Sequence, residues 1–142
     1  MIKPLPLWLA RGALLTVLAW NLSAALPYRL WPADYAGAFE LSGAPGQAAV
    51  RGIGLLFLMW AVPFIPAILH PVRHRVALVI VLAMQAIGLA GESLLLMTLP
   101  AGHAALRATG LRFIALDGLG LILLTIAYRI TDKPHDALPI TH

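Results

Sequence analysis

Residues 76–99 form an apolar run, VALVIVLAMQAIGLAGESLLLMTL, that is long enough to cross a lipid bilayer and contains one carboxylate, Glu92. A membrane-spanning helix needs about 20 predominantly apolar residues, and an ionisable group inside it requires a partner or a hydrated cavity. We therefore expect the rest of the chain to supply a partner for Glu92 or a polar space around it.

The composition supports a membrane protein. Hydrophobic residues make up 61% of the 142 residues and charged residues 11%, which leaves too little polar surface for a water-soluble domain. The net charge of +4 comes mostly from basic residues beside apolar runs, so it indicates membrane topology and no nucleic-acid partner. The chain has no cysteine, which excludes disulfides and thiol chemistry.

Four apolar runs predict a single all-α domain, a four-helix transmembrane bundle over residues 1–130. The expected spans are about 7–26, 48–69, 76–99 and 104–130, followed by a tail at 131–142. A cleaved signal peptide is the alternative for the first run, because a basic start and small residues near its end resemble a cleavage region; we favour a retained helix.

Prolines mark the expected helix boundaries and bends. Pro27 is expected to end the first span, and Pro32 to start a short interfacial helix in the polar loop 27–47. Pro63 and Pro66 should kink the second span, because each removes a backbone donor. The loop 27–47 is the longest polar connection and the place where we expect a partner or a lid.

Basic residues are unevenly distributed between the two expected sides of the membrane. One side holds Lys3, Arg73, Arg75, Arg129 and Lys133. The positive-inside rule therefore places both termini in the cytoplasm and the loop 27–47 outside. The expected location is the plasma membrane, which in a bacterium is the inner membrane.

Charged and polar residues within the spans form the candidate site. Its members are Arg51, Glu92, Arg112, Asp117, Gln85 and Asn21. A helical rise of ~1.5 Å per residue places the four charged residues in the half of the bundle away from the cytoplasm. Because burying an unpaired charge is costly, we expect the two arginines to pair with the two carboxylates.

The spacing of polar residues within the third span indicates which face of that helix carries the site. Gln85, Gly88 and Glu92 recur at i, i+3 and i+7, so they share one helix face, and Gly88 should let another backbone approach that face. The cluster has three alternative roles: a structural ion-pair network, a polar ligand pocket opening outward, or an ion pathway. The inner half offers no matching acids for a pathway, and we predict no metal site and no catalytic residue.

Two segments resemble a known family. The second span opens with AAVRGIGLLFLMW, and the third carries GLAGES. Together with four helices and a long loop after the first, these segments are similar to the DoxX-like superfamily of small four-helix membrane proteins. The resemblance implies a four-helix fold and a link to quinone-coupled redox systems. Where relatives often carry an arginine in the third helix, this chain has Glu92.

We expect a non-enzymatic accessory or scaffold protein that associates with another membrane protein or with a second copy of itself in the lipid bilayer. The alternative is a protein that binds an amphiphile, a lipid or a quinone, and a transporter is a third reading. No cofactor is identified. A cavity lined by at least two of the four charged residues would favour the binding protein, and an exposed groove of small residues without a cavity would favour the subunit.

Overall fold

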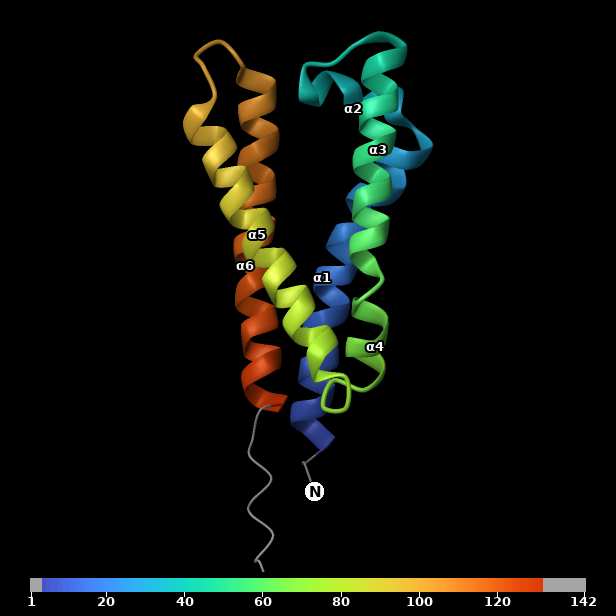
Figure 1. The fold of residues 1–142 in the computed structure, drawn as a ribbon, viewed down its shortest axis with the longest axis vertical. Coiled ribbons are helices and arrows are strands. Elements are labelled where there is room, and N and C mark those ends of the chain that lie inside the picture. The colour runs from blue at the N-terminus through green and yellow to red at the C-terminus, as the bar shows by residue number, and fades with distance from the viewer. Residues whose placement is uncertain (1–3, 132–142) are drawn as a thin grey trace, which may run out of the picture.

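The computed structural model describes residues 4–131, which form a bundle with four helical segments of membrane-spanning length (Figure 1). The elements are α1 (Pro4–Leu30), α2 (Pro32–Ala36), the 3₁₀ helix η1 (Gly37–Phe39), α3 (Gly43–Ala61), α4 (Phe64–Leu69), α5 (Arg75–Thr98) and α6 (Ala104–Thr131). The predicted all-α membrane bundle is confirmed. Most of the expected tail, residues 132–142, lies outside the described residues, as does Lys3.

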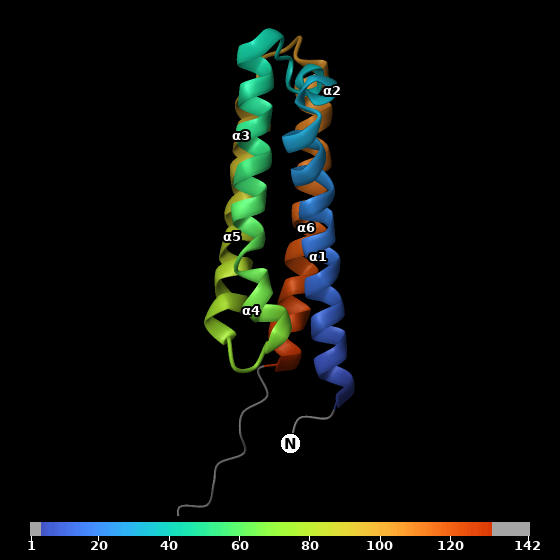
Figure 2. The same ribbon diagram turned by 90° about the vertical axis from the view of Figure 1, so that its right-hand side faces the viewer.

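The four long segments stand side by side with α5 and α3 at the front and α6 and α1 behind them (Figures 1 and 2). The packed pairs are α1 with α3, α5 with α6, and α1 with α6. We call the end that carries α2 the upper end and the end that carries Pro4 and Thr131 the lower end, as in Figure 1. Both ends of the described chain therefore lie at the same end of the bundle, as an even number of spans requires.

A proline step divides the second span into α3 and α4. The helix breaks at Val62 and Pro63, and α4 then packs against α1 and α5. Arg11 of α1 completes this arrangement, because it donates hydrogen bonds from Nε to the Ile68 carbonyl at 3.0 Å and from Nη2 to the Leu69 carbonyl at 2.7 Å. These carbonyls lie in the last turn of α4, where no helical partner remains for them.

The main apolar core fills the lower half of the bundle, where α4 brings the second span against its neighbours. Its buried members are Leu14, Val17, Phe64, Ala67, Leu78, Val81 and Leu124. All five elements within the spans meet there by side-chain packing, since α1, α4, α5 and α6 contribute buried residues and α3 adds Trp60 at the edge.

The prediction for Pro27 is wrong. Helix α1 continues through this residue to Leu30, and the chain turns only at Trp31. A proline within a membrane helix is tolerated when neighbouring groups satisfy the carbonyl that loses its donor. Pro32 occupies the first turn of α2, as predicted.

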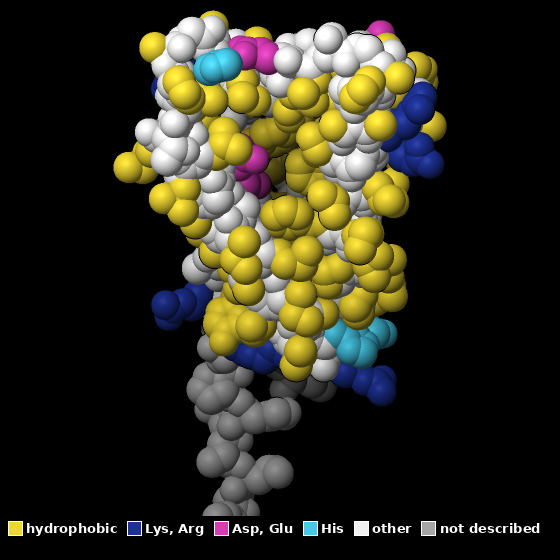
Figure 3. Space-filling model, turned by 45° about the horizontal axis from the view of Figure 1, so that its top comes forward, with side chains coloured by type: hydrophobic (Ala, Val, Ile, Leu, Met, Phe, Trp, Pro, Cys, Tyr) yellow, Lys and Arg dark blue, Asp and Glu magenta, His cyan; other side chains and the backbone are white. Residues whose placement is uncertain are grey.

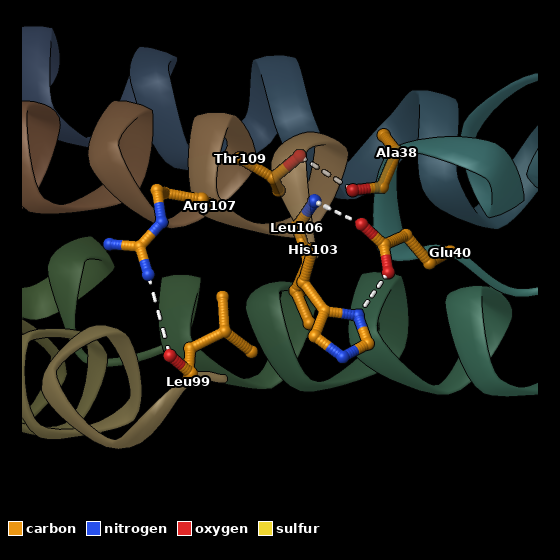
Figure 4. A network of polar contacts seen from close by, with 7 residues as sticks. All are labelled: Ala38, Glu40, Leu99, His103, Leu106, Arg107 and Thr109. Carbon is orange, nitrogen blue, oxygen red and sulfur yellow. Dashed lines mark hydrogen bonds and ion pairs between the residues drawn. The ribbon is translucent and has the colours of Figure 1, made fainter. Parts of the chain in front are cut away.

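The loop between α1 and α3 reaches across the upper end and contacts α6 (Figure 4). Glu40, whose φ of 55° is left-handed, receives hydrogen bonds from His103 Nδ1 at 2.5 Å and from the Leu106 amide at 3.3 Å. Thr109 Oγ1 donates to the Ala38 carbonyl at 2.7 Å. We call these contacts the upper clasp, because they join η1 and the residue that follows it to the start of α6.

Candidate ligand-binding site

A cleft lies in the upper half of the bundle, below the upper clasp. It is lined by Val17, Trp20, Asn21, Ala24, Phe57, Trp60, Gln85, Gly88, Glu92, Phe113, Leu116 and Asp117. The cleft holds about 510 Å³ of space that no protein atom occupies, including the part open to the surroundings. Figure 3 shows the hollow, with acidic side chains inside a surface that is otherwise mainly hydrophobic.

The cleft exists because two helix pairs separate toward the upper end. The α5–α6 pair and the α1–α3 pair diverge upward in Figure 1. The opening therefore lies at the front, between α3 and α5 (Figure 3). The sequence led us to expect a polar pocket opening outward; in Figure 3 the hollow is seen on the front face of the bundle, between helices of membrane-spanning length.

Asp117 is held in the cleft by Gln85 of the neighbouring helix. Gln85 Nε2 donates to Asp117 Oδ1 at 2.8 Å. This amide fits because Gly120 of α6 has no side chain: a Cβ there would lie 2.7 Å from Gln85 Nε2. A glycine in α6 thus allows the α5 side chain to orient the α6 carboxylate.

Glu92 enters the same cleft from α5. Its Oε2 lies 3.7 Å from the position that a Cβ would take at Gly110 of α6, so the carboxylate lies between the two helices. Gly88, one turn earlier, makes room for other side chains, because a Cβ there would lie 2.8 Å from Asp117 Oδ2 and 2.9 Å from Trp60 Cη2. We expected a backbone to approach Gly88, but two side chains from α6 and α3 occupy that place.

The structure brings four of the six predicted site residues together. Gln85, Glu92, Asp117 and Asn21 line the cleft. The two arginines do not join them, and the predicted ion pairs are not formed by the described residues.

Arg51 and Arg112 are both exposed, outside the cleft lining. An arginine near a membrane surface can extend its long side chain toward water, which removes the need for a buried carboxylate partner. Within residues 4–131, the ion pair found is the one between His103 and Glu40 in the upper clasp.

Aromatic side chains form the walls of the cleft, and the sequence analysis did not identify them. Phe57 lies 6.1 Å from Trp60 and 5.7 Å from Phe113 between ring centroids, which links α3 to α6. Trp20 adds a further ring from α1. The sequence contains one sign of the α1 wall: the α1 residues that line the cleft repeat at helical intervals from position 17 to position 24.

Three buried polar atoms in the cleft lining have no hydrogen-bond partner among the described residues. They are Asn21 Nδ2, Trp60 Nε1 and Gln85 Oε1. Buried polar groups are normally satisfied, so such atoms gathered at one cavity indicate a place where a bound molecule or water completes the bonding. Two of these atoms are donors and one is an acceptor.

The upper clasp lowers the pKa of one carboxyl group outside the spans, that of Glu40. The hydrogen bond from His103 lowers the pKa of Glu40 below its usual value of 4.5, and the Leu106 amide acts in the same direction. Glu40 is therefore ionised at neutral pH.

No protein-family model matches the chain, and searches of curated proteins and of solved structures return no match. The resemblance to the DoxX-like superfamily therefore stays a prediction. Within residues 4–131, no three His, Cys, Asp or Glu side chains lie close enough to hold a metal ion. The candidate site is the cleft itself, defined by its shape and its polar atoms.

Proposed function

We propose that this membrane protein binds an amphiphile in the cleft, with the polar head against Glu92 and Asp117 and the apolar body extending between α3 and α5. The observation that carries the proposal is a cavity lined by two carboxylates that have no cationic partner among the described residues. This is the feature that separates a binding protein from a purely structural subunit.

The lining of the cleft supports a small-molecule site. Ligand pockets combine apolar walls with a few polar groups. The polar groups of this cleft gather at one position, Gln85, Glu92 and Asp117, with Asn21 facing from α1. A structural role alone would favour carboxylates that are paired and enclosed, since unpaired buried charge is destabilising.

The direction of the opening supports an amphiphile as the ligand. The cleft opens through the side of the bundle, between two apolar helices, and hydrophobic side chains surround it (Figure 3). A molecule reaching it from the bilayer carries an apolar body that can remain against lipid and the helix surfaces. A purely polar solute would first have to cross the hydrocarbon region, which is costly.

Association with another membrane protein or a second copy, which was the first expectation from the sequence, becomes the second candidate function. Gly52, Gly91 and Gly118 lie in long helices, and a Cβ at each would meet no atom within 4 Å. Small residues on a lipid-facing surface allow a second helix to approach closely. Both functions are compatible with one molecule, and the cleft supports ligand binding as the leading proposal.

Native mass spectrometry of protein extracted in a mild non-ionic detergent tests the proposal. We expect a monomer that carries one discrete small-molecule mass. Gly88→Leu should lose that mass, because the new side chain collides with Asp117 and Trp60, whereas Gly91→Leu, on the open face of the same helix, should retain it. A bare protein, or a bound mass that survives Gly88→Leu, would contradict the proposal.

We also propose that the lower end faces the cytoplasm of a plasma membrane, which puts the cleft in the outer half of the bilayer. Arg73 and Arg129 at the lower end support this orientation. Because the chain has no cysteine, Ser42→Cys and His74→Cys each give a single thiol for an impermeant reagent. Labelling of intact cells at position 42 and not at position 74 is expected, and the reverse pattern would overturn the orientation.

A further inference from the structure

The cleft contains two carboxyl groups, and amphiphile binding alone does not explain why both are there. Glu92 and Asp117 line it, and none of the described residues that line it is Lys, Arg or His. Asp117 accepts a hydrogen bond from the neutral amide of Gln85, and Glu92 accepts none within residues 4–131. Two carboxylates beside one poorly hydrated space attract a cation, because little else there balances their charge.

The unpartnered oxygen of Gln85 is an independent observation at the same place. Gln85 is 2% exposed, its Nε2 is bonded to Asp117, and its Oε1 has no partner among the described residues. An amide oxygen only accepts hydrogen bonds, so the group that completes it must be an N–H or O–H donor. The side chain that orients Asp117 therefore also presents an acceptor to whatever occupies the cleft.

The aromatic walls suit the same kind of ligand. Trp20, Phe57, Trp60 and Phe113 line the cleft, and the ring faces of tryptophan and phenylalanine attract cations. Carboxylates and aromatic faces in one cavity favour a positively charged group over a neutral group of equal size. The attraction is largest where water is excluded.

We propose that the head group bound in this cleft is a protonated amine carried on an apolar chain. Its N–H groups donate to Glu92, Asp117 and Gln85 Oε1, and its charge lies against the aromatic walls. The inference rests on the proposed amphiphile-binding function and names the chemical class of its ligand. Both a free long-chain amine and an amino-lipid head group present this chemistry.

A neutral quinone head fits these groups less well. Quinone carbonyls only accept hydrogen bonds, so they offer no donor to the carboxyl oxygens of Glu92 and Asp117 or to Gln85 Oε1, whereas an ammonium group carries three donors. The unpartnered donors, Asn21 Nδ2 and Trp60 Nε1, fit an acceptor oxygen placed next to the amine, as in an amino alcohol. A head group that joins an ammonium to an oxygen carries both the donor and the acceptor that the three unpartnered atoms require.

Three decyl amphiphiles of equal chain length test the inference: decylammonium, decanol and decyl sulfate. Each is titrated near neutral pH into protein in non-ionic micelles, and tryptophan fluorescence is recorded. Trp20 and Trp60 line the cleft and report on it, while Trp8 and Trp31 are 65% and 58% exposed and give the background signal. We expect decylammonium to bind about tenfold more tightly than decanol, and decyl sulfate more weakly than both.

Carboxamide variants assign the preference to the cleft. Glu92→Gln keeps the size of the side chain, and Glu92 accepts no hydrogen bond from the described residues that the change would remove. The variant should show a preference for decylammonium over decanol that is reduced about tenfold. Asp117→Asn should act in the same direction. Asp34→Asn is the matched control, because it removes an exposed carboxylate outside the cleft lining, and it should leave binding unchanged.

The possible results separate the two proposals. Equal binding of decylammonium and decanol by the natural protein would overturn the amine and leave amphiphile binding in place. No saturable response to any of the three would overturn both. A cation preference that survives Glu92→Gln and Asp117→Asn together would place the charge recognition outside the cleft and overturn the inference. An amino-lipid and a free long-chain amine are then compared in the same fluorescence titration to distinguish the two sources.

Discussion

In the lower half of the bundle the helices meet around Phe64, Leu78 and Leu124, all fully buried, whereas in the upper half the same helices separate around Glu92 and Asp117. The proline step accounts for much of this difference. Below it, α4 packs against both α1 and α5; above it, α3 packs against α1 and leaves its other side open to the cleft. A single break in one span therefore lets one bundle contain a packed core and a binding space.

The largest effect should come from removing a core ring in the lower half. Phe64→Ala leaves an enclosed cavity and should lower the free energy of unfolding by about 3–5 kcal/mol. Phe57→Ala, in the cleft wall, should cost about 1–2 kcal/mol, because it enlarges a space that already exists. Unfolding in mixed micelles, followed by circular dichroism, measures both. Equal losses would show that the two halves are packed alike.

The next test concerns the close contact between α1 and α3 at Gly54. This contact shows that the helices beside the cleft are tightly packed against each other. A Cβ at Gly54 would lie 2.8 Å from the Arg29 amide nitrogen and 2.9 Å from the Ala25 carbonyl oxygen. Gly54→Ala should therefore destabilise the protein by about 2 kcal/mol in the same assay. Gly52→Ala, which meets no atom within 4 Å, should be neutral or slightly stabilising, and an equal loss there would contradict the close approach.

A smaller effect is expected from the upper clasp, which joins the two helix pairs where they are farthest apart. Thr109→Val removes the hydrogen bond to the Ala38 carbonyl and should cost about 1 kcal/mol. Thr125→Val is the control, because that exposed hydroxyl bonds to the Leu121 carbonyl of its own helix and should be nearly silent. The melting temperature in detergent compares the two variants. A larger loss for Thr125→Val would refute the clasp as a stabilising contact.

The smallest effect is the pH dependence of Glu40. Because its pKa in the folded protein is lowered below 4.5, this carboxylate stabilises the fold at neutral pH, and the stabilisation is lost as the pH falls through that lowered pKa. When the pH is lowered from neutral to below the pKa of Glu40, the melting temperature of the natural protein should therefore fall more than that of Glu40→Gln. Parallel curves would show that the interaction with His103 contributes nothing measurable.

The length and hydropathy of the four runs were sufficient to predict the fold, because apolar segments of membrane-spanning length have few other stable structures. The helix that starts at Pro32 and the bend at Pro63 could be predicted from the backbone chemistry of proline. The end of α1 could not, because a membrane helix can accommodate a proline such as Pro27 when its surroundings satisfy the freed carbonyl.

The candidate site was predictable only in part. The stripe of Gln85, Gly88 and Glu92 lies on one helix face and lines the cleft, as its spacing indicates. The partners were harder to predict, because nearly every face of these helices is apolar and the pattern does not say which face meets a neighbour. Formal charge balance suggested Arg51 as a partner, but an arginine near a membrane surface can turn toward water.

The sideways opening between α3 and α5 makes the bilayer the solvent from which any occupant is drawn. The concentration that matters is then the mole fraction of ligand in the membrane, so apparent affinity is the product of partitioning and local binding. Each added methylene improves partitioning by ~0.8 kcal/mol, or about fourfold, without a new contact to the protein. Chain length would therefore set how much ligand is available, while Glu92 and Asp117 select among head groups already dissolved in the lipid.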